Sequence, residues 1–288
     1  MAIRIGISGW TYPPWRGVFY PRKWPQAKEL ELAASRFRAI EVNGTFYGLQ
    51  RPETFADWAS RTPADFVFAV KGSRYITHML ALREAETALA NFLASGILRL
   101  GPKLGPILWQ FPARFAFDEE RMGSFLALLP HDTIAAAALA RNHDVRLKGR
   151  AWTTTDARRP LRHAVEIRHE SFRDRRFIAL LRKHHIALVC ADTVAWPRLM
   201  DVTADFIYCR LHGSQELYAS GYDPPALAAW ARRVAAWARG SEPADAERVA
   251  GRASRRTTGR DVFVFFDNDA KVRAPADAAA LVDLLGRG

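Results

Sequence analysis

The segment His163–Glu170, with the sequence HAVEIRHE, places acidic and basic side chains where they can do chemistry. If the segment forms a β-strand, Val165 and Ile167 share one face while Glu166 and Arg168 share the other, because side chains alternate along a strand. Burying a carboxylate and a guanidinium on one face is costly unless they pair or serve a site. We therefore expect this strand to belong to an active site, in which a water-filled pocket solvates Arg168.

Other apolar segments carry polar residues in a similar pattern. On several of them the polar residues alternate with the apolar ones near the carboxyl end, as with Glu41 beside Ile40 and Val42. Two more segments end in polar residues. One ends at Asp192, which is in phase with Cys190, and the other ends in the run Asp267–Asn268–Asp269. The full set is Glu41, Asn43, Lys71, Gln110, Asp192, Arg210, His212 and the run Asp267–Asn268–Asp269. Polar residues at the carboxyl ends of barrel strands mark the face on which barrel active sites lie.

The residue types predict proton transfer and the binding of negative charge. Carboxylates and a histidine can act as general acids or bases, and a lysine can carry or release a proton. The residues that we expect to be catalytic are Glu41, Lys71, Glu166, Asp192 and His212. Others can bind a substrate through charge, hydrogen bonds or stacking. The residues that we expect to bind substrate are Trp10, Asn43, Tyr47, His78, Gln110, Arg168, Arg210 and Asn268.

Aromatic residues cluster near the same predicted strand ends. They are Trp10, Tyr12, Trp15, Tyr47 and Tyr218. They can form a stacking wall for a sugar or a base, and ordinary packing at the rim of a barrel explains them equally well.

Eight short segments rich in apolar, β-branched and aromatic residues are predicted strands. They are Ile3–Gly9, Ala39–Thr45, Asp65–Gly72, Gly105–Pro112, His163–His169, Ile186–Asp192, Asp205–Gly213 and Asp261–Asn268. The predicted helices between them are Gln26–Phe37, Pro52–Ser60, Arg83–Ser95, Asp118–Leu129, Asp174–His184, Pro224–Arg239 and Pro275–Leu285. Strands and helices that alternate in this way predict an α/β fold, a (β/α)8 TIM-barrel-like domain.

The alternation extends over the whole chain of 288 residues, so we expect a single domain. No glycine-rich dinucleotide-binding or P-loop motif follows the first strand, which argues against a doubly wound nucleotide-binding sheet. Residues 131–162 and 241–260 interrupt the pattern with many arginines and little apolar periodicity. We expect both to be basic insertions that are at least partly flexible.

Composition limits the compartment and the partners. The formal net charge of +12 favours anionic partners, although a basic surface can also serve solubility alone. Cys190 and Cys209 lie within apolar segments, as expected for buried thiols in a reducing compartment. No apolar run approaches the roughly 18 residues of a membrane span, and the N-terminus does not read as a signal peptide. We expect a soluble cytoplasmic protein with no membrane partner.

Seven motifs resemble, in order, those of the DUF72 (YecE-like) family. They are GISGWTYPPWRGVFYP, AIEVNGTFYGLQRP, FVFAVKGSRYITHML, LGPILWQFP, HAVEIRHESF, DFIYCRLHG and VFFDND followed by AP. The resemblance covers nearly the whole chain except the two basic insertions, and it implies a TIM-barrel-like fold. It implies no particular reaction. One departure is Asp267, where the family pattern more often has Asn, and this adds a charge at the tip of the last strand.

Three functions remain open from the sequence. The first is acid–base chemistry by a hydrolase, lyase or isomerase on a small anionic, oxygen-rich or sugar-like substrate, with no cofactor. The second is a divalent-metal enzyme with Glu41, Glu166, Asp192 and His212 as ligands. We expect no tightly bound metal, because Lys71 and two arginines would repel a cation. The third is weak nucleic-acid binding or processing through the basic surface. The first is favoured because inward carboxylates are poorly explained by binding alone.

Overall fold

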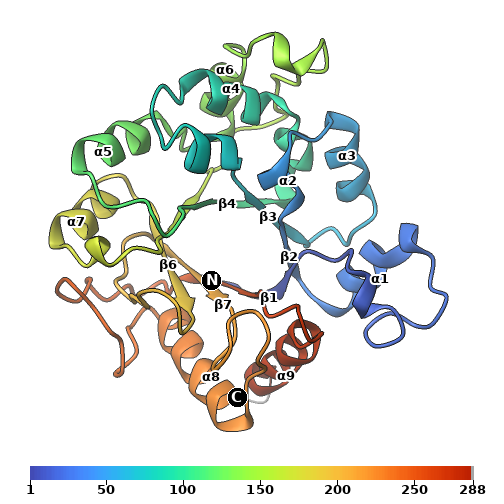
Figure 1. Cartoon of the computed structure of the whole chain (residues 1–288), viewed down its shortest axis with the longest axis vertical. Coiled ribbons are helices and arrows are strands. Elements are labelled where there is room, and N and C mark those ends of the chain that lie inside the picture. The colour runs from blue at the N-terminus through green and yellow to red at the C-terminus, as the bar shows by residue number, and fades with distance from the viewer. Residues whose placement is uncertain (287–288) are drawn as a thin grey trace.

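The computed structural model describes residues 1–286 and shows a closed barrel of eight parallel strands (Figure 1). Each strand pairs with the next, and the last pairs with the first. The strands are β1 (Ile3–Ser8), β2 (Ala39–Val42), β3 (Val67–Lys71), β4 (Leu104–Gln110), β5 (His163–Glu166), β6 (Ala187–Asp192), β7 (Phe206–Leu211) and β8 (Asp261–Phe266). The predicted (β/α)8 fold is confirmed, and all eight predicted strands overlap the observed ones.

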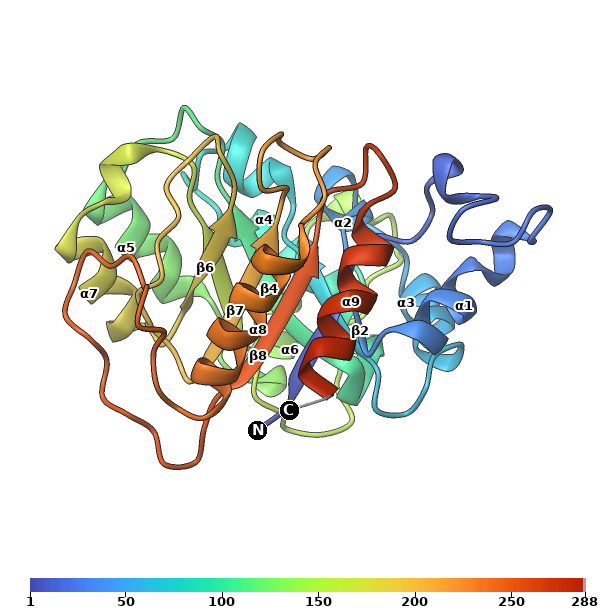
Figure 2. The ribbon, with the colours of Figure 1, turned by 90° about the horizontal axis from the view of Figure 1, so that it is seen from below.

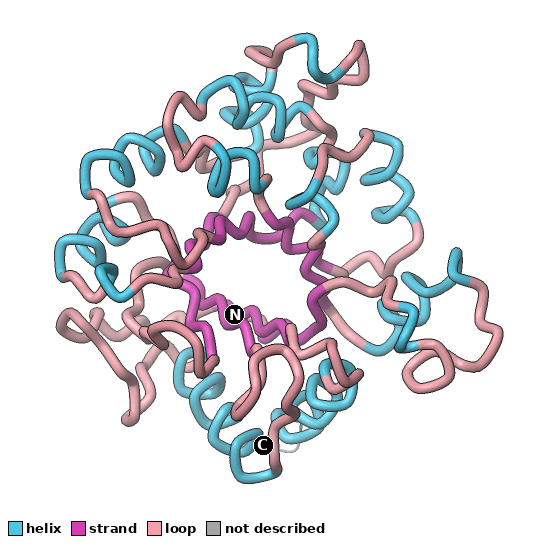
Figure 3. Tube along the Cα trace, in the orientation of Figure 1, coloured by secondary structure: helices cyan, strands magenta, loops and turns pink. Residues whose placement is uncertain are grey.

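Helices surround the ring of strands (Figure 3). They are α1 (Glu29–Arg36), α2 (Gly44–Tyr47), α3 (Pro52–Ser60), α4 (Glu86–Ala94), α5 (Glu119–Leu128), α6 (Thr133–Ala140), α7 (Arg175–Lys183), α8 (Pro224–Ala238) and α9 (Ala274–Gly286). The short helical segments are η1 (Pro13–Trp15), η2 (Gln26–Lys28), the π-helix η3 (Tyr75–Met79), η4 (Ile97–Lys103), η5 (Val145–Leu147) and η6 (Glu170–Phe172). The helices α5, α7 and α8 each begin after an aspartate whose carboxylate accepts a hydrogen bond from a backbone N–H of the first turn.

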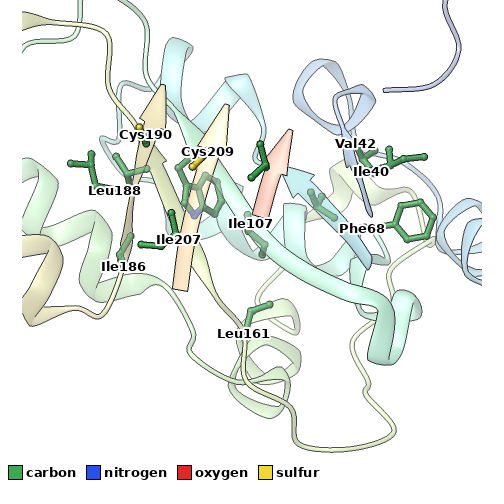
Figure 4. Packing of buried hydrophobic residues seen from close by; sticks show 14 of the residues in the cluster. Ile40, Val42, Phe68, Ile107, Leu161, Ile186, Leu188, Cys190, Ile207 and Cys209 are labelled. Carbon is green, nitrogen blue, oxygen red and sulfur yellow. The ribbon is translucent and has the colours of Figure 1, made fainter. Parts of the chain in front are cut away.

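Apolar side chains form two layers, one on each side of the strands. The outer layer packs the strands against the helices, and Figure 4 shows part of it, including Ile40, Phe68, Ile107 and Cys190. The inner layer fills the lumen with residues such as Ala39 and Tyr208. The predicted alternation is confirmed on β2, where Ile40 lies in the outer layer. The strand ends therefore carry their inward polar residues to the mouth of the barrel, toward which the arrowheads of β6 and β8 point in Figure 2.

The two basic segments are tied to the barrel by specific contacts. Residues 131–162 contain α6, which packs against α4, and a bridge between Asp132 and Pro160. Residues 241–260, all of them described, contain no helix or strand. Two backbone N–H groups of that segment donate to the buried Asp201, and the buried Arg260 donates to the carbonyl oxygens of Ser241 and Ser254.

Two further expectations concern cysteines and membranes. Cys190 on β6 and Cys209 on β7 are buried free thiols that face each other across the strand pair. Across residues 1–286, none of the helices combines the length and the apolar character that a bilayer span requires.

A tight approach between β1 and β2 gives the first prediction. A Cβ atom at Gly6 would lie 1.8 Å from the carbonyl oxygen of Ala39, its partner on β2. Because a backbone atom cannot move aside without opening the barrel, Gly6→Ala should lower the free energy of unfolding by about 3 kcal/mol or more. Urea denaturation followed by circular dichroism measures this change.

Gly123→Ala in α5 is the matched control. Its added Cβ would meet no atom closer than 3.6 Å, that atom being Leu180 Cδ1, and alanine favours a helix interior. We expect it to raise stability by up to about 1 kcal/mol. An unchanged unfolding midpoint for Gly6→Ala would contradict the close packing of β1 on β2.

Candidate functional site

Arg210 of β7 lies at the centre of the barrel mouth, with no exposed side-chain surface. Its guanidinium contacts three carboxylates from three other strands or strand ends. Nη2 lies 2.8 Å from Glu41 Oε1 and 2.7 Å from Asp267 Oδ2, and Nη1 lies 2.5 Å from Glu166 Oε2. The alternation of β2, β5, β7 and β8 brings these side chains together, because each occupies an inward position at its strand's end. We call Arg210, Glu41, Glu166 and Asp267 the ionic floor.

Further side chains hold the ionic floor in place. The Tyr208 hydroxyl donates to Glu41 at 2.6 Å, and Ser8 donates to the same carboxylate at 2.9 Å. Arg168 lies 2.8 Å from Glu166. The ring of His212 lies between two acids, with Nδ1 3.1 Å from Asp267 and Nε2 3.7 Å from Glu166. The strands β1, β2, β5 and β7 and the segment that follows β8 are thereby cross-linked through polar contacts inside the lumen.

The charges of the floor shift the pKa values of its members. Burial alone would raise the pKa of Glu166, but the guanidinium groups of Arg210 and Arg168 hold it well below its usual range. Burial also opposes ionisation of Asp267, yet Arg210 and His212 lower its pKa to about 2. Both carboxylates are therefore ionised at neutral pH, as pairing with buried cations requires.

A cavity of about 710 Å³ opens above the floor. Its lining combines aromatic, cationic, acidic and amide side chains from the loops that follow several strands. The lining residues are Tyr12, Pro14, Asn43, Phe46, Tyr47, Lys71, His78, Gln110, Arg168, Tyr218, Asp267, Asp269 and Ala270. Six of them were expected to serve a site, namely Asn43, Tyr47, Lys71, His78, Gln110 and Arg168. Glu41, Glu166, Arg210 and His212 lie beneath, with no exposed surface.

The expectation of a solvated pair is therefore wrong for Glu166. Its carboxylate is fully buried, and protein guanidinium groups take the place that water was expected to fill. Only Arg168 reaches the cavity, where 15% of its side chain is exposed.

Lys71 ends β3 and is the most deeply placed cation of the cavity wall. Only 8% of it is exposed, and its ammonium lies 4.5 Å from the centre of the Phe46 ring. Burial, together with the charge of Arg210, lowers the pKa of Lys71 to about 8. An amine with this pKa is partly neutral near physiological pH, so it can accept a proton or act as a nucleophile.

Asp269 is a cavity residue that the sequence analysis did not select as catalytic or substrate-binding. Burial and the neighbouring charge of Asp267 raise its pKa to about 8, so the carboxyl keeps its proton at neutral pH. Its buried Oδ1 has no hydrogen-bond partner within residues 1–286. The sequence named it only as part of the polar run Asp267–Asn268–Asp269, and it lies in a turn beyond the end of β8, where strand alternation no longer applies.

His78 lies in the π-helix η3, a geometry often found at functional sites. Its Nδ1 lies 2.9 Å from Thr77 Oγ1, and its ring meets the Phe46 ring edge-on. Burial and the nearby charges of Lys71 and Arg168 lower the pKa of His78 to about 4. Its imidazole is therefore neutral at physiological pH.

Two predicted site residues point away from the cavity. Asp192 lies on the helix side of β6, where it accepts hydrogen bonds from Arg198 at 3.0 Å and from the Trp230 indole at 3.1 Å. Asn268 donates to Asp277 of α9 at 2.8 Å. The expectation that Asp192 joins Glu41 and Glu166 is wrong, because Asp192 is in phase with the outer-layer Cys190. Asn268 also points toward the helices, because it is in phase with Phe266 of the outer layer.

The aromatic residues divide between three places. Tyr12, Tyr47 and Tyr218 line the main cavity. Trp10 lines a neighbouring cavity of about 260 Å³, together with Trp58. Trp15 is fully buried and packs beside Tyr12, so it cannot stack on a ligand.

The donor set does not resemble a metal centre. In the portion of the chain with assigned positions, residues 1–286, no group of three or more His, Cys, Asp or Glu side chains is arranged to hold a metal ion. Glu41 and Glu166 direct their oxygens at Arg210, so a cation would have to displace the guanidinium.

Comparisons with known proteins agree on one family. Residues 4–288 match the family model described as "Protein of unknown function DUF72". The chain is 33% identical over 129 residues to the UPF0759 protein YecE of Escherichia coli K12, and 30% identical over 125 residues to the UPF0759 protein YunF of Bacillus subtilis 168. These alignments span 44% and 43% of the length of the relatives, and 44% and 42% of this chain.

Solved structures show the same fold. A DUF72 family protein from Thermotoga maritima MSB8 superposes with a TM-score of 0.74 at 23% identity, covering 99% of this chain and 100% of the other. A DUF72 family protein from Enterococcus faecalis V583 gives a TM-score of 0.68 at 18% identity, covering 99% and 95%.

The ionic floor predicts a large cost for removing one charge. Glu166→Gln keeps the shape of the side chain but leaves Arg210 and Arg168 with less counter-charge in a buried place. The free energy of unfolding should fall by about 3–5 kcal/mol. Thermal and urea unfolding test this, with Glu170→Gln as the control. Glu170 is 71% exposed, so its change should stay within about 0.5 kcal/mol. Equal stabilities for the two variants would contradict a structural role for Glu166.

The raised pKa of Asp269 predicts that the stability of the protein depends on pH. The folded chain keeps this proton up to pH about 8, whereas the unfolded chain loses it near the ordinary value of 3.8. Between these values the folded state binds more protons, so the contribution of Asp269 to stability falls as pH rises. Asp269→Asn removes the effect.

The melting temperature of Asp269→Asn minus that of the unmodified chain should therefore rise from pH 5 to pH 8 and level off above pH 9. Differential scanning fluorimetry measures it, and Asp65→Asn, at an exposed position, should show no such trend. A flat difference for Asp269→Asn would mean that Asp269 ionises normally.

Proposed function

The chain belongs to the DUF72 family, and on that premise we propose that it is an enzyme. It performs acid–base chemistry on a small anionic, oxygen-rich substrate at the mouth of the barrel. The family's description assigns no reaction, so the proposal depends on the side chains of this chain alone.

One observation carries the proposal: the cavity wall holds polar groups that the protein itself leaves unpaired. Within residues 1–286, the Lys71 ammonium and the Gln110 amide make no hydrogen bond, and neither does Nη1 of Arg168. In the ionic floor directly below, by contrast, the charged side chains are paired with one another. Buried polar groups are normally satisfied, so unpaired donors that converge on one cavity favour a ligand with several oxygen atoms.

The proposed roles follow from charge and position. Arg168 and Gln110 bind an anionic group and an oxygen of the substrate. Lys71 is the base or nucleophile, because it is partly neutral near pH 8. Asp269 is the acid, because it keeps its proton to about the same pH. Neutral His78 offers a ring nitrogen to the substrate. Such a set suits a hydrolase, lyase or isomerase.

Glu41, Glu166 and His212 take a supporting role in this proposal. They have no exposed surface, so they do not touch the substrate. They hold Arg210 and Asp267, and the charges of these two residues adjust the pKa values of Lys71 and Asp269.

The basic surface is proposed to attract the anionic substrate rather than to bind nucleic acid. Several arginines of the basic segments are already neutralised, such as Arg248 by Glu242 at 2.9 Å and Arg159 by Asp156 at 2.6 Å. We also propose a cytoplasmic location, which the free thiols of Cys190 and Cys209 favour.

A substrate screen with pH profiles tests the proposal. A panel of small carboxylated and phosphorylated sugars and acids is screened by thermal shift and then for turnover. For a substrate found in this way, Lys71→Met should lower kcat/KM by about 100-fold or more, while Lys28→Met at an exposed site should leave it unchanged.

The pH profile should be bell-shaped. Activity rises as Lys71 loses its proton and falls as Asp269 loses its own, so the maximum lies near pH 8. The residual activity of Asp269→Asn should lack the alkaline limb. Full activity in both Lys71→Met and Asp269→Asn would refute these roles.

A further inference from the structure

We propose that the side-chain amine of Lys71 forms a Schiff base with the carbonyl group of a substrate that also carries an anionic group. This inference rests on the proposed function and narrows its substrate class to anionic aldehydes and ketones.

The position of Lys71 suits a covalent attachment point. The residue ends β3, and its backbone carbonyl accepts a hydrogen bond from Thr45 at 2.7 Å, which holds the strand end in place. Its side chain extends from this rigid element into the cavity of about 710 Å³. The amine is shielded from bulk water but open to a ligand, because 8% of the residue remains exposed.

A second buried lysine shows what a purely structural one looks like. Lys103 is exposed to a similar 9%, but its ammonium donates hydrogen bonds to the carbonyl oxygens of Ala59, at 2.5 Å, and Thr62, at 2.7 Å. Lys71 has no such bonds in the region that the structure describes, and its ammonium rests against the Phe46 ring. An amine without hydrogen bonds can lose its proton at less cost and is free to move toward a carbon atom.

The chemistry balances without an oxidant or a reductant. The lone pair of the neutral Nζ attacks the carbonyl carbon, and one of the two protons of the nitrogen passes to the carbonyl oxygen, which becomes the hydroxyl of a carbinolamine. The hydroxyl then takes a proton from an acid, the carbon–oxygen bond breaks, water leaves, and the nitrogen, which keeps its remaining proton, forms a protonated imine. Asp269 lines the same cavity and can donate the proton. The carboxylates of the ionic floor stabilise the protonated imine, as they now offset the charge of Lys71.

Arg168 selects substrates that carry negative charge. One edge of its guanidinium is held by Glu166 and by the Tyr218 hydroxyl, and its face stacks at 4.0 Å on the Trp196 ring. Within residues 1–286 its Nη1 makes no hydrogen bond, and the side chain lines the cavity. A fixed guanidinium of this kind recognises a carboxylate or a phosphate.

Borohydride trapping tests the inference on the full chain. The protein is incubated separately with pyruvate, with dihydroxyacetone phosphate and with acetone, and each mixture is reduced with sodium borohydride. Intact mass and peptide mapping locate the secondary amine that results. The two anionic probes distinguish a carboxylate from a phosphate, and acetone tests the need for charge.

We expect one adduct per chain at Lys71, at least tenfold more abundant with an anionic probe than with acetone. Lys103 and the exposed Lys28 should stay unlabelled. Lys71→Arg, which keeps the charge and is checked for an unchanged melting temperature, should give no adduct. Adducts spread over surface lysines, or none with either anionic probe, would overturn the Schiff base.

Two readouts separate this inference from the proposed function. If a panel substrate is turned over and its kcat/KM falls about 100-fold in Lys71→Met, yet borohydride traps no adduct at Lys71 with that substrate, the Schiff base is wrong and acid–base chemistry by Lys71 stands. Competitive acylation across pH 6–11 measures the reactivity of each lysine without any substrate. If the acylation of Lys71 has the same pH midpoint as that of an exposed lysine, and no panel compound is turned over, both proposals fail.

Discussion

A guanidinium buried at the centre of the barrel is the constraint on which the site depends. An unpaired charge there would cost several kcal/mol, so Arg210 requires counter-charges within contact distance. Glu41, Glu166 and Asp267 provide them from three different places around the ring. The mouth of the barrel is thereby cross-linked by ion pairs rather than by the apolar packing that fills the lumen below.

This floor also determines the electrostatics of the cavity above it. Arg210 disfavours a second positive charge at Lys71, and Asp267 disfavours a second negative charge at Asp269. Burial acts in the same direction on both groups, because it penalises either charged form. One buried cluster therefore moves the pKa of an amine and of a carboxyl toward each other. Pairs of titratable groups with opposed shifts are a common arrangement in sites that transfer protons.

The arrangement divides the barrel mouth into a satisfied layer and an unsatisfied one. The floor has its donors and acceptors paired within the protein, which gives it rigidity. The wall presents polar atoms of Lys71, Gln110 and Arg168 that find no hydrogen-bond partner among residues 1–286, on elements that the floor holds in place. A rigid support under an unsatisfied wall is what a preorganised binding site needs. The strand pairing establishes the barrel, and the proposal of chemistry depends on the side chains of the wall.

Local patterns were sufficient to predict much of the architecture. Apolar and β-branched segments predicted the eight strands, and their alternation with helices predicted the barrel. Side-chain alternation along the strands predicted the inward positions of Glu41, Lys71 and Glu166. Side-chain alternation also implied that Asp192 points outward, because Asp192 is in phase with Cys190 of the outer layer. Tertiary structure alone decided how deep each inward residue lies and which loops cover it. Burial depth depends on side chains that are distant in sequence, so the sequence could not separate the closed floor from the open wall. Tertiary structure also decided that Asp269 lies in the cavity. The residue belongs to the loop after β8, and the path of this loop over the barrel mouth depends on segments that are distant in sequence.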